Sequence, residues 1–518
     1  MTAQATTNSD SDFDVTEKTV AELQAAMASG KTSAQQLVRL YLSRIAAVDQ
    51  AGPRLNSVIE LNPDALAIAS ALDAERKAKG PRGPLHGIPV LLKDNIATAD
   101  KMQTTAGSLA LAGIKPPRDA ALVSRLRDAG AVILGKTNLS EWANMRSTRS
   151  TSGWSARGGL TLNPYALDRN TSGSSSGSGA SMAASLAAIA VGTETDGSIT
   201  SPASVASLVG IKPTVGLVSR AGVVPIAHSQ DTAGPMARTV ADAAALLTAM
   251  AGSDARDPAT VLADQKKVDY TQFLNRNGLQ GKRIGVVRSQ LASSGEPVAT
   301  LVESQLAVLK AQGATLVDVA EVPNIAKYAD TELTVLLYEL KADMAAYLAD
   351  YGPSAPVKTL ADVIAFNDQH RAQEMPYFGQ EHFVNAQTKG GLDSQEYLDA
   401  LANNHRYARE EGLDQVMKEH QLDALVAPTC GPAWLTDFIN GDASGASFTT
   451  PAAVAGYPHI TVPCGYVHGL PCGLSFVAGA WAEGPLIAMA YAYEQASLQR
   501  RAPTYAKSLN LQVAAKQK

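Results

Sequence analysis

The chain has 518 residues, of which 45% are hydrophobic and 18% are charged, a composition typical of a folded globular protein and not of a disordered or fibrous one. Its formal net charge is -5, so it lacks the basic character with which proteins attract nucleic acid or an acidic membrane surface. Three cysteines, Cys430, Cys464 and Cys472, have neither the number nor the spacing of a disulfide framework or a zinc site. We therefore expect small or neutral partners, no nucleic acid and no membrane.

The first 13 residues are polar and are expected to form a flexible leader. They contain no charged segment followed by an apolar stretch, and the most apolar later segment, 182–191, is too short and too rich in Ala and Ser to span a bilayer. We expect a soluble, cytoplasmic protein, although loss of an upstream leader would leave export open.

The N-terminal part of the chain alternates between helical and extended patterns. Helices are predicted over 19–27, over 33–47 with Ser33 as the N-cap, and over 63–79. The segment GPLHGIPVLLKDN then indicates a turn that leads into a short buried strand ending at Lys93. A helix over 120–129 and a strand over 131–134 follow, so the pattern is typical of an α/β fold.

Residues 147–179 are dense in Ser, Gly, Thr and Asn, which is typical of a functional loop with unusual backbone geometry. A buried helix of small residues is predicted over 178–190. Beyond residue 281 the sequence predicts the strands 283–287, 315–319, 423–427, 460–463 and 473–477 and the helices 297–312, 330–349, 394–420 and 486–497.

The stretch from Ser172 to Thr214 reads SGSSSGSGASMAASLAAIAVGTETDGSITSPASVASLVGIKPT. With its Gly/Ser-rich loop, its GTxTxGS turn and its terminal GxKPT, it resembles the signature of the amidase-signature family. Ser174 and Ser198 stand 24 residues apart, as the paired serines of that family do, and Lys93 in GIPVLLKDN matches the family's lysine. The resemblance continues through KTNLSEWAN, NPY, SQDTAGPMARTVADAA and PAAVAGYPHITVP, and so covers nearly the whole chain in order.

This resemblance implies an α/β fold with a mixed central β-sheet covered by helices on both faces. It implies a single domain over 14–510, in which 255–425 is the variable region that shapes the pocket, followed by a tail at 511–518. Within the family, SGWSARGG and GTETDGSI are similar to bacterial peptide amidases, which hydrolyse the C-terminal carboxamides of peptides. The resemblance also implies a cis peptide bond between Gly173 and Ser174.

The residues support the same chemistry. An amide is a poor electrophile, so a serine that attacks it needs a base and needs donors for the developing oxyanion. Lys93 at the end of an apolar strand would be desolvated, which favours its neutral, basic form. We expect Ser198 to be the nucleophile, Ser174 to relay the proton to Lys93, and the backbone N–H groups of Thr195, Asp196, Gly197 and Ser198 to form the oxyanion hole.

Two segments of the chain match motifs of other enzyme classes. The segment from Gly130 to Thr137 matches the P-loop expression GxxxxGK[ST], but its AVIL core favours a strand over a phosphate-binding loop. The segment from Gly173 to Gly177 fits GxSxG of the α/β-hydrolases, but the preceding residues are turn formers and do not predict the strand that this motif needs.

The sequence leaves the substrate open. The leading substrate class is the C-terminal amides of peptides. Aryl amides, esters or carbamates are the alternative within the same chemistry. The alternative of another class is a partner-dependent subunit like the A subunit of the tRNA-dependent amidotransferases. No metal or organic cofactor is expected. Asp196 is expected to make hydrogen bonds within its turn, Asp231 and Arg238 to pair with each other, and His86, His228 and Asp94 to have structural roles.

Overall fold

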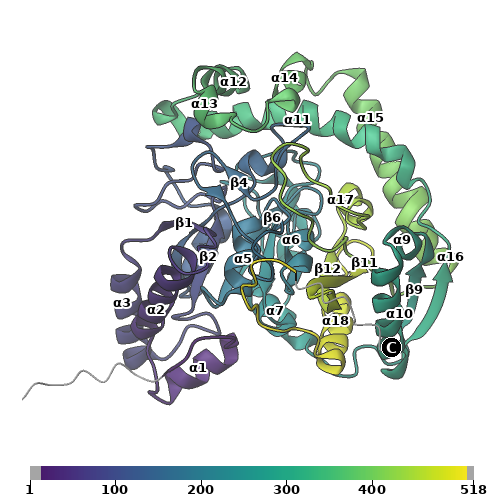
Figure 1. Cartoon of the computed structure of the whole chain (residues 1–518), viewed down its shortest axis with the longest axis horizontal. Helices are drawn as coiled ribbons and strands as arrows, with labels where there is room; N and C mark the ends of the chain where they lie inside the picture. Colours follow the sequence, from purple (N-terminus) through teal and green to yellow (C-terminus); the bar gives the residue numbers. More distant parts are fainter. Residues whose placement is uncertain (1–12, 510–518) are drawn as a thin grey trace, which may run out of the picture.

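The computed structural model describes residues 13–509 (Figure 1). Apart from Phe13, the expected leader and the expected tail lie outside these residues. Within them the chain builds a mixed 11-stranded sheet and a two-stranded ribbon. In spatial order the strands of the sheet are β1 Val58–Leu61, β3 Val132–Thr137, β2 Pro89–Lys93, β6 Ile189–Glu194, β8 Thr232–Ala237, β7 Val209–Lys212, β12 His459–Val467, β13 Leu470–Val477, β11 Ala424–Pro428, β9 Arg283–Val287 and β10 Thr315–Val319, and the ribbon is β4 Trp154–Ser155 and β5 Gly159–Leu160.

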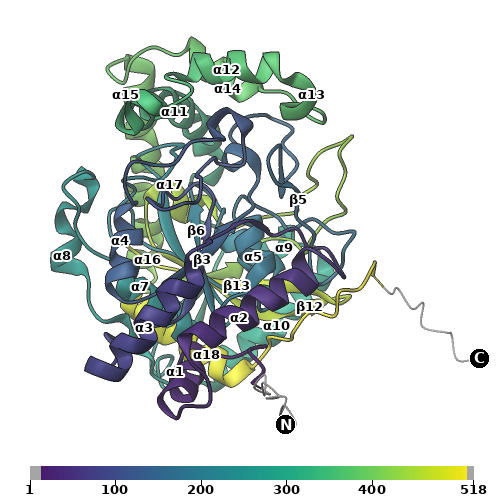
Figure 2. The ribbon, with the colours of Figure 1, turned by 90° about the vertical axis from the view of Figure 1, so that its left-hand side faces the viewer.

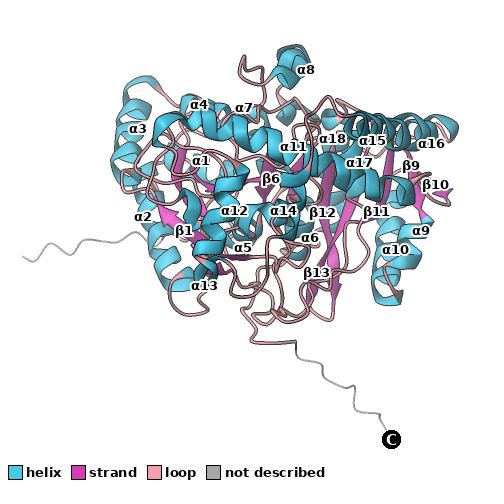
Figure 3. Ribbon diagram, turned by 90° about the horizontal axis from the view of Figure 1, so that it is seen from above, coloured by secondary structure: helices cyan, strands magenta, loops and turns pink. Residues whose placement is uncertain are grey.

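Helices flank this sheet (Figures 1 and 3). Their bounds are α1 Val20–Ala28, α2 Ala34–Arg44, α3 Ala65–Lys79, α4 Ala121–Asp128, α5 Ser176–Ala183, α6 Thr200–Val205, α7 Val240–Met250, α8 Ala263–Lys266, α9 Arg288–Ser293, α10 Glu296–Ala311, α11 Tyr328–Tyr351, α12 Leu360–Gln369, α13 Arg371–Glu374, α14 Glu381–Thr388, α15 Gln395–His405, α16 Asp414–Glu419, α17 Thr450–Ala455 and α18 Glu483–Ser497. Helices α11 to α15 gather at the top of Figure 1, whereas α8 stands away from the body in Figure 2. None of the helices within 13–509 is both long and apolar enough to cross a membrane. The fold therefore confirms the expected mixed sheet with helices on its faces.

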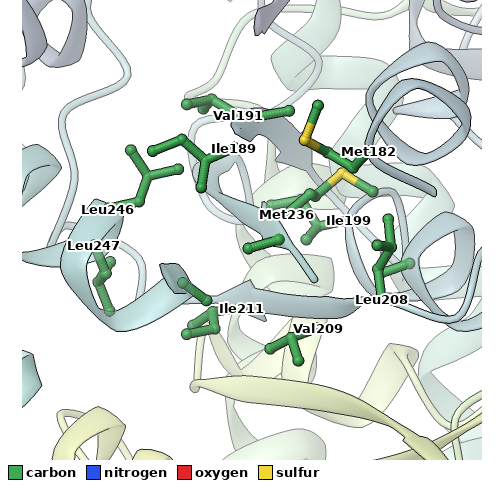
Figure 4. Close-up of a cluster of buried hydrophobic side chains, with 14 of the residues drawn as sticks. Met182, Ile189, Val191, Ile199, Leu208, Val209, Ile211, Met236, Leu246 and Leu247 are labelled. Atoms are coloured by element: carbon green, nitrogen blue, oxygen red, sulfur yellow. The ribbon is translucent and has the colours of Figure 1, made fainter. Parts of the chain in front are cut away.

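The centre of the sheet is packed from both sides. Figure 4 shows Leu246 and Leu247 of α7 on one side of the strands, and Met182 of α5 with Ile199 on the other. All residues of β2 and β6 are buried, and the two strands pair with each other in parallel. Parallel strands covered on both faces have this continuously apolar sequence, because neither face meets water. Lys93, at the carboxyl end of β2, therefore lies inside the protein.

The predicted helix over 178–190 is wrong in its second half. Helix α5 ends at Ala183, Ser185 has a φ of 56°, and Ile189 already belongs to strand β6. A run of small residues is compatible with either a buried helix or a buried central strand, and here the sheet decides. The strand β8 was also not predicted, because its Gly234 and Pro235 are typical of turns.

The predicted helix over 394–420 is interrupted. Helix α15 ends at His405, residues 406–413 form a wider π-helical segment in which Gly412 leaves helical geometry, and α16 follows from Asp414. Glycine weakens a helix at such a position. The other predicted strands and helices are confirmed to within a few residues, and Ser33 caps α2 by accepting the backbone N–H of Gln36 at 3.2 Å.

A buried ion cluster ties the helical layer at the top of Figure 1 to the body of the protein. The side chain of Arg146 is fully buried, its Nη1 lies 2.6 Å from Glu141 Oε1 and 3.7 Å from Glu374 Oε2 of α13, and its guanidinium stacks 4.4 Å from the centre of the Phe378 ring. Removing one partner of a buried ion pair strands the others in a medium of low polarity.

Replacing Arg146 by methionine is therefore expected to lower the free energy of unfolding by about 3–5 kcal/mol. Denaturant titration of the variant measures this loss. Arg149→Met is the matched control, because the Arg149 side chain is exposed and donates to the carbonyl oxygen of Ile439 at 2.9 Å, and its loss should change stability by less than about 1 kcal/mol. Equal effects of the two substitutions would contradict the structural role of the cluster.

Candidate active site

Lys93 lies at the carboxyl end of β2 with no exposed surface. Its Nζ donates to Ser174 Oγ at 2.7 Å, to Thr193 Oγ1 at 2.8 Å and to the carbonyl oxygen of Thr193 at 3.2 Å. Strand β6 runs parallel to β2 as its neighbour, so Thr193 reaches the same edge of the sheet as Lys93. Two strands thus hold the ammonium group beside Ser174.

Burial lowers the pKa of Lys93 to about 7, and the negative charges of Asp231 and Glu194 offset only part of that effect. No carboxylate accepts a hydrogen bond from Nζ among the described residues, where its partners are the hydroxyl and carbonyl groups named above. A lysine with a pKa near 7 is neutral in a large fraction of molecules at neutral pH, and a neutral amine is a base. The strand position therefore equips Lys93 for proton transfer.

Ser174 lies in the Gly/Ser-rich segment just before α5 and is fully buried. The Gly173–Ser174 peptide bond is cis, as the family resemblance implied. A side chain at Gly173 would meet Ser140 Oγ at 2.1 Å, so only glycine fits there. The carbonyl oxygen of Ser174 accepts the backbone N–H of Ser140 at 3.0 Å, which fixes the segment against the core.

Ser198 lies in the tight turn between β6 and α6, with 8% of its surface exposed. Its carbonyl oxygen accepts the backbone N–H of Ser175 at 3.1 Å, so the segments that carry the two predicted serines touch. Gly197 has a φ of 76°, and a side chain there would meet Ser201 and Thr449 at 3.0 Å. The turn therefore requires glycine immediately before the serine.

The same turn presents backbone donors. Within residues 13–509, the N–H groups of Asp196, Gly197 and Ser198 donate to no other protein group. Thr195, the fourth predicted member, donates its hydroxyl to Asp231 Oδ1 at 2.6 Å. Consecutive unused N–H groups beside a serine are the arrangement that can hold an oxyanion.

Three carboxyl groups fix this turn through hydrogen bonds. Glu194 Oε2 accepts the backbone N–H groups of Ile199 and Thr200, at 2.7 and 2.9 Å. Asp231 binds Thr195, and Asp196 Oδ2 accepts the hydroxyl of Thr450 in α17 at 2.7 Å. The expectation that Asp196 bonds within its own turn is therefore wrong: its partner comes from a distant segment that the local sequence could not indicate. Burial raises the pKa of Asp196.

The other sequence motifs have structural roles. Lys136 of the P-loop expression lies inside β3, fully buried, and donates to the carbonyl oxygen of Ile96 and to Thr104 Oγ1, both at 2.7 Å. His86 Nε2 lies 2.9 Å from the carbonyl oxygen of Leu72, and Asp94 Oδ2 lies 3.2 Å from Arg157 Nη1. His86 and Asp94 thus have the structural roles that were expected.

The expected pair of Asp231 and Arg238 does not form. The two residues flank β8 at opposite ends. Asp231 Oδ2 accepts the backbone N–H groups of Ile226 and Ala227, at 2.8 and 3.0 Å, whereas Arg238 donates to backbone carbonyl groups, including that of Lys18 at 2.7 Å. A six-residue strand holds the charges apart, and because β8 was not predicted, the sequence suggested a loop that would bring them together.

One group of side chains could offer three ligands to a metal ion. His228, Glu339 and Asp343 place their ligand atoms within 4.8 Å of one another, and no other such group occurs in residues 13–509. Both nitrogens of His228 already have carboxylate neighbours, Asp343 at 3.0 Å and Glu339 at 3.3 Å. An imidazolium paired with two carboxylates satisfies the same geometry, so the group is a structural link between the loop before β8 and α11.

Two residues beside Lys93 were not predicted from the sequence. Thr193 accepts the hydrogen bond of Lys93, and Asn95 Nδ2 donates to the same Thr193 Oγ1 at 3.0 Å. Their signal was present but ambiguous: Asn95 lies two residues after Lys93, and Thr193 lies in the GTETDGS segment. Without the strand pairing, neither position could be assigned to the lysine.

The chain is similar to known proteins over most of its length. The model of the amidase family matches residues 36–487. The native peptide amidase from Stenotrophomonas maltophilia is similar in structure, with a TM-score of 0.90 and 54% sequence identity over 95% of this chain and 99% of that chain. A probable amidase of Arabidopsis thaliana is 43% identical over 505 residues, 96% of this chain and 93% of the relative.

The A subunit of glutamyl-tRNA(Gln) amidotransferase from Halorhodospira halophila is also similar, at 37% identity over 490 residues, 92% of this chain and 97% of the relative. Its identity to this chain is lower than that of the peptide amidase structure. The family match spans most of the chain and includes the Lys93, Ser174 and Ser198 segments. The chain therefore belongs to the amidase family and is an amide-hydrolysing enzyme.

Proposed function

We propose that the protein hydrolyses the C-terminal carboxamide of peptides to a carboxylate and ammonia, with Ser198 as nucleophile. The observation that carries the chemistry is the contact of the buried Lys93 Nζ with Ser174 Oγ, at 2.7 Å, in a segment that touches the Ser198 turn. The substrate class follows from the 54% identity to the Stenotrophomonas peptide amidase, which exceeds the 37% identity to the amidotransferase subunit.

In the proposed acylation, Ser198 Oγ attacks the amide carbon and its proton passes through Ser174 to neutral Lys93. The N–H groups of Asp196, Gly197 and Ser198, with that of Thr195 at the edge of the turn, stabilise the negative oxygen that forms. The proton returns through Ser174 to the nitrogen, and ammonia leaves. Water then attacks the acyl-Ser198 ester by the same proton transfers in reverse, which frees the serine and the acid.

The region 255–425 is proposed to set the acyl specificity. Its helix α11 brings Glu332 to Gln230, which donates to Glu332 Oε1 at 2.8 Å and to the carbonyl oxygen of Thr195 at 3.3 Å. The Gln230 side chain therefore links helix α11 to the turn that carries Ser198. A substitution in α11 can therefore alter the turn while Lys93, Ser174 and Ser198 stay the same.

A matched panel of substrates tests the proposed function. One N-blocked peptide is offered as its C-terminal amide, its N-methylamide, its aryl amide and its methyl ester, and kcat/KM is measured for each. We expect the primary amide to be hydrolysed with release of ammonia, and the free-acid peptide not to be processed further. Hydrolysis of the aryl amide or the ester alone would replace the proposed substrate with one of those classes.

The pH dependence of the reaction is expected to follow Lys93. Because its pKa is about 7 and the neutral form is the base, kcat/KM should rise tenfold per pH unit below about 7 and level off above it. An N-blocked peptide amide carries no titrating group of its own in this range, so the profile reports on the enzyme. A profile that is flat or falls between pH 6 and pH 8 would contradict the role of Lys93 as base.

A further inference from the structure

A cavity of about 470 Å³ lies on the side of the site formed by the loop before β8 and by α11. Its walls include Arg220, Val223, Asp231 and Asp343, and it reaches the surface beside the exposed residue Ala346. None of Lys93, Ser174 and Ser198 lines it. The cavity thus reaches Asp231, which accepts the hydroxyl of Thr195 in the turn that carries Ser198.

A second, much smaller cavity lies further inside. It measures about 10 Å³, roughly the space of one water molecule, and its walls include Asn95, Thr193 and Thr195. Arg220, Val223 and Asp231 line both cavities. Asp231 is therefore the carboxylate that borders both a solvent-connected space and a space next to the Thr193 hydroxyl that binds Lys93.

The polar atoms around the small cavity suit one water molecule. Thr193 Oγ1 accepts from Lys93 Nζ at 2.8 Å and from Asn95 Nδ2 at 3.0 Å, which uses both lone pairs and leaves its O–H to donate. Asn95 Oδ1 is buried and accepts no hydrogen bond from residues 13–509. Asp231 Oδ1 accepts only the Thr195 hydroxyl, so a lone pair remains. A water there would have the two to four partners that buried waters have.

The reaction requires a way out for a proton. Deacylation returns one proton to Ser198 and frees a carboxylic acid, which is far more acidic than the ammonium form of Lys93, so the acid passes its proton through Ser174 to Lys93 and leaves as a carboxylate. Lys93 must lose this proton to solvent before it can act as a base again. Its Nζ has no exposed surface, and so the proton needs a relay.

We propose that Asp231 is the proton-relay residue through which Lys93 exchanges its proton with solvent; this rests on the proposed function of Lys93 as the base. The Lys93 ammonium gives a proton to Thr193 Oγ1, the Thr193 hydroxyl gives its own proton to the water of the small cavity, and that water gives one to Asp231 Oδ1. Asp231 then releases a proton into the large cavity. Only N–H and O–H bonds form and break in these transfers, and each group returns to its starting form.

The charges around Asp231 are compatible with this role. Burial raises its pKa to about 6, against hydrogen bonds from Thr195, Ile226 and Ala227 that lower it. This value lies close to the pKa of about 7 of Lys93. Because the two groups bind a proton with similar affinity, transfer between them costs little free energy in either direction. Asp343 raises the pKa of Asp231 further, and Asp231 in turn raises that of Arg220 across the large cavity.

The variant Asp231→Asn tests the relay, because asparagine keeps the shape but cannot carry the proton. With an amide that wild type hydrolyses, we expect kcat to fall at least about tenfold in dilute buffer and to recover as imidazole, which is small enough for the large cavity, is added. Wild-type kcat should not depend on imidazole. A kcat that stays at the wild-type level, or that is low at every imidazole concentration in a folded variant, would overturn the proposal.

Asp350→Asn is the matched control, since the exposed Asp350 lines the large cavity but not the small one. It should keep its kcat within about twofold and show no dependence on imidazole. Inactivity of wild type on every peptide amide would count against the proposed function, whereas imidazole-independent kinetics of Asp231→Asn would count against the relay alone. The two failures are therefore distinguishable.

A second variant keeps the test open if Asp231→Asn does not fold. Cys430, Cys464 and Cys472 are all buried, so an introduced surface cysteine can be labelled selectively. Ala346→Cys at the mouth of the large cavity should have wild-type kcat before labelling. After complete reaction with a bulky maleimide, kcat should fall at least about tenfold with KM unchanged. An unchanged kcat in the fully labelled protein would show that the proton leaves by another route.

Discussion

Replacing Ser198 by alanine is expected to lower kcat for amide hydrolysis by at least about 10⁴-fold. Without the hydroxyl no acyl-enzyme can form, and the N–H groups of the turn and the bound substrate would supply only residual rate enhancement. The fold should not change, because Ser198 holds its neighbours through its backbone carbonyl oxygen, which accepts the N–H of Ser175 at 3.1 Å. Steady-state kinetics and thermal denaturation together measure both expectations.

Ser201→Ala is the matched control for this experiment. Ser201 lies three residues further along, at the start of α6, and is partly exposed. The variant should keep its kcat within about threefold of wild type. A Ser198→Ala enzyme with more than a small residual activity, or an equally large loss in Ser201→Ala, would remove Ser198 from the proposed role.

Replacing Lys93 by methionine is expected to lower kcat/KM by about 10³-fold or more, because general base catalysis contributes roughly 10²–10⁴-fold and no other described amine is placed to contact Ser174. Methionine is an unbranched side chain of similar volume, carries no charge and needs no hydrogen-bond partner. Residual activity should lose the rise between pH 6 and pH 8 that is expected of wild type.

The same substitution is expected to stabilise the protein. Folding lowers the pKa of Lys93 from 10.5 to about 7, so between these pH values the unfolded chain binds more protons than the folded protein does. This contribution raises stability as pH rises from 7 to 10.5, and it is unfavourable at neutral pH. Lys93→Met should therefore unfold at a higher temperature than wild type at pH 7, with a gain that shrinks toward pH 10.5. A lower melting temperature at pH 7 would contradict this account.

Much of the fold could be predicted from the sequence. The strand that ends at Lys93 and, apart from the helix over 394–420, the strands and helices after residue 281 follow from short apolar runs and helical spacing, and the structure confirms them. The two errors have different causes. In residues 178–190 local composition favours a continuous helix, but the sheet takes Ile189 into β6, so tertiary packing overrides local preference there. In residues 394–420 the helical pattern is interrupted at Gly412, a residue that weakens helices.

The candidate site divides in a similar way. Lys93, Ser174 and Ser198 could be named because they stand in motifs, and the structure brings their segments together at one edge of the sheet. Thr193, Asn95 and the true partner of Asp231 could not be named, because each depends on which strands are neighbours. Asp196 shows the same limit, since its partner Thr450 lies 254 residues away along the chain.

The most direct test of the central claim is the release of ammonia from an N-blocked peptide amide by wild type and by Ser198→Ala, with the free-acid peptide quantified in the same reaction. The account predicts that wild type releases ammonia and free acid in equal amounts and that folded Ser198→Ala releases neither above background. Equal release by both proteins, or ammonia without matching acid, would contradict it.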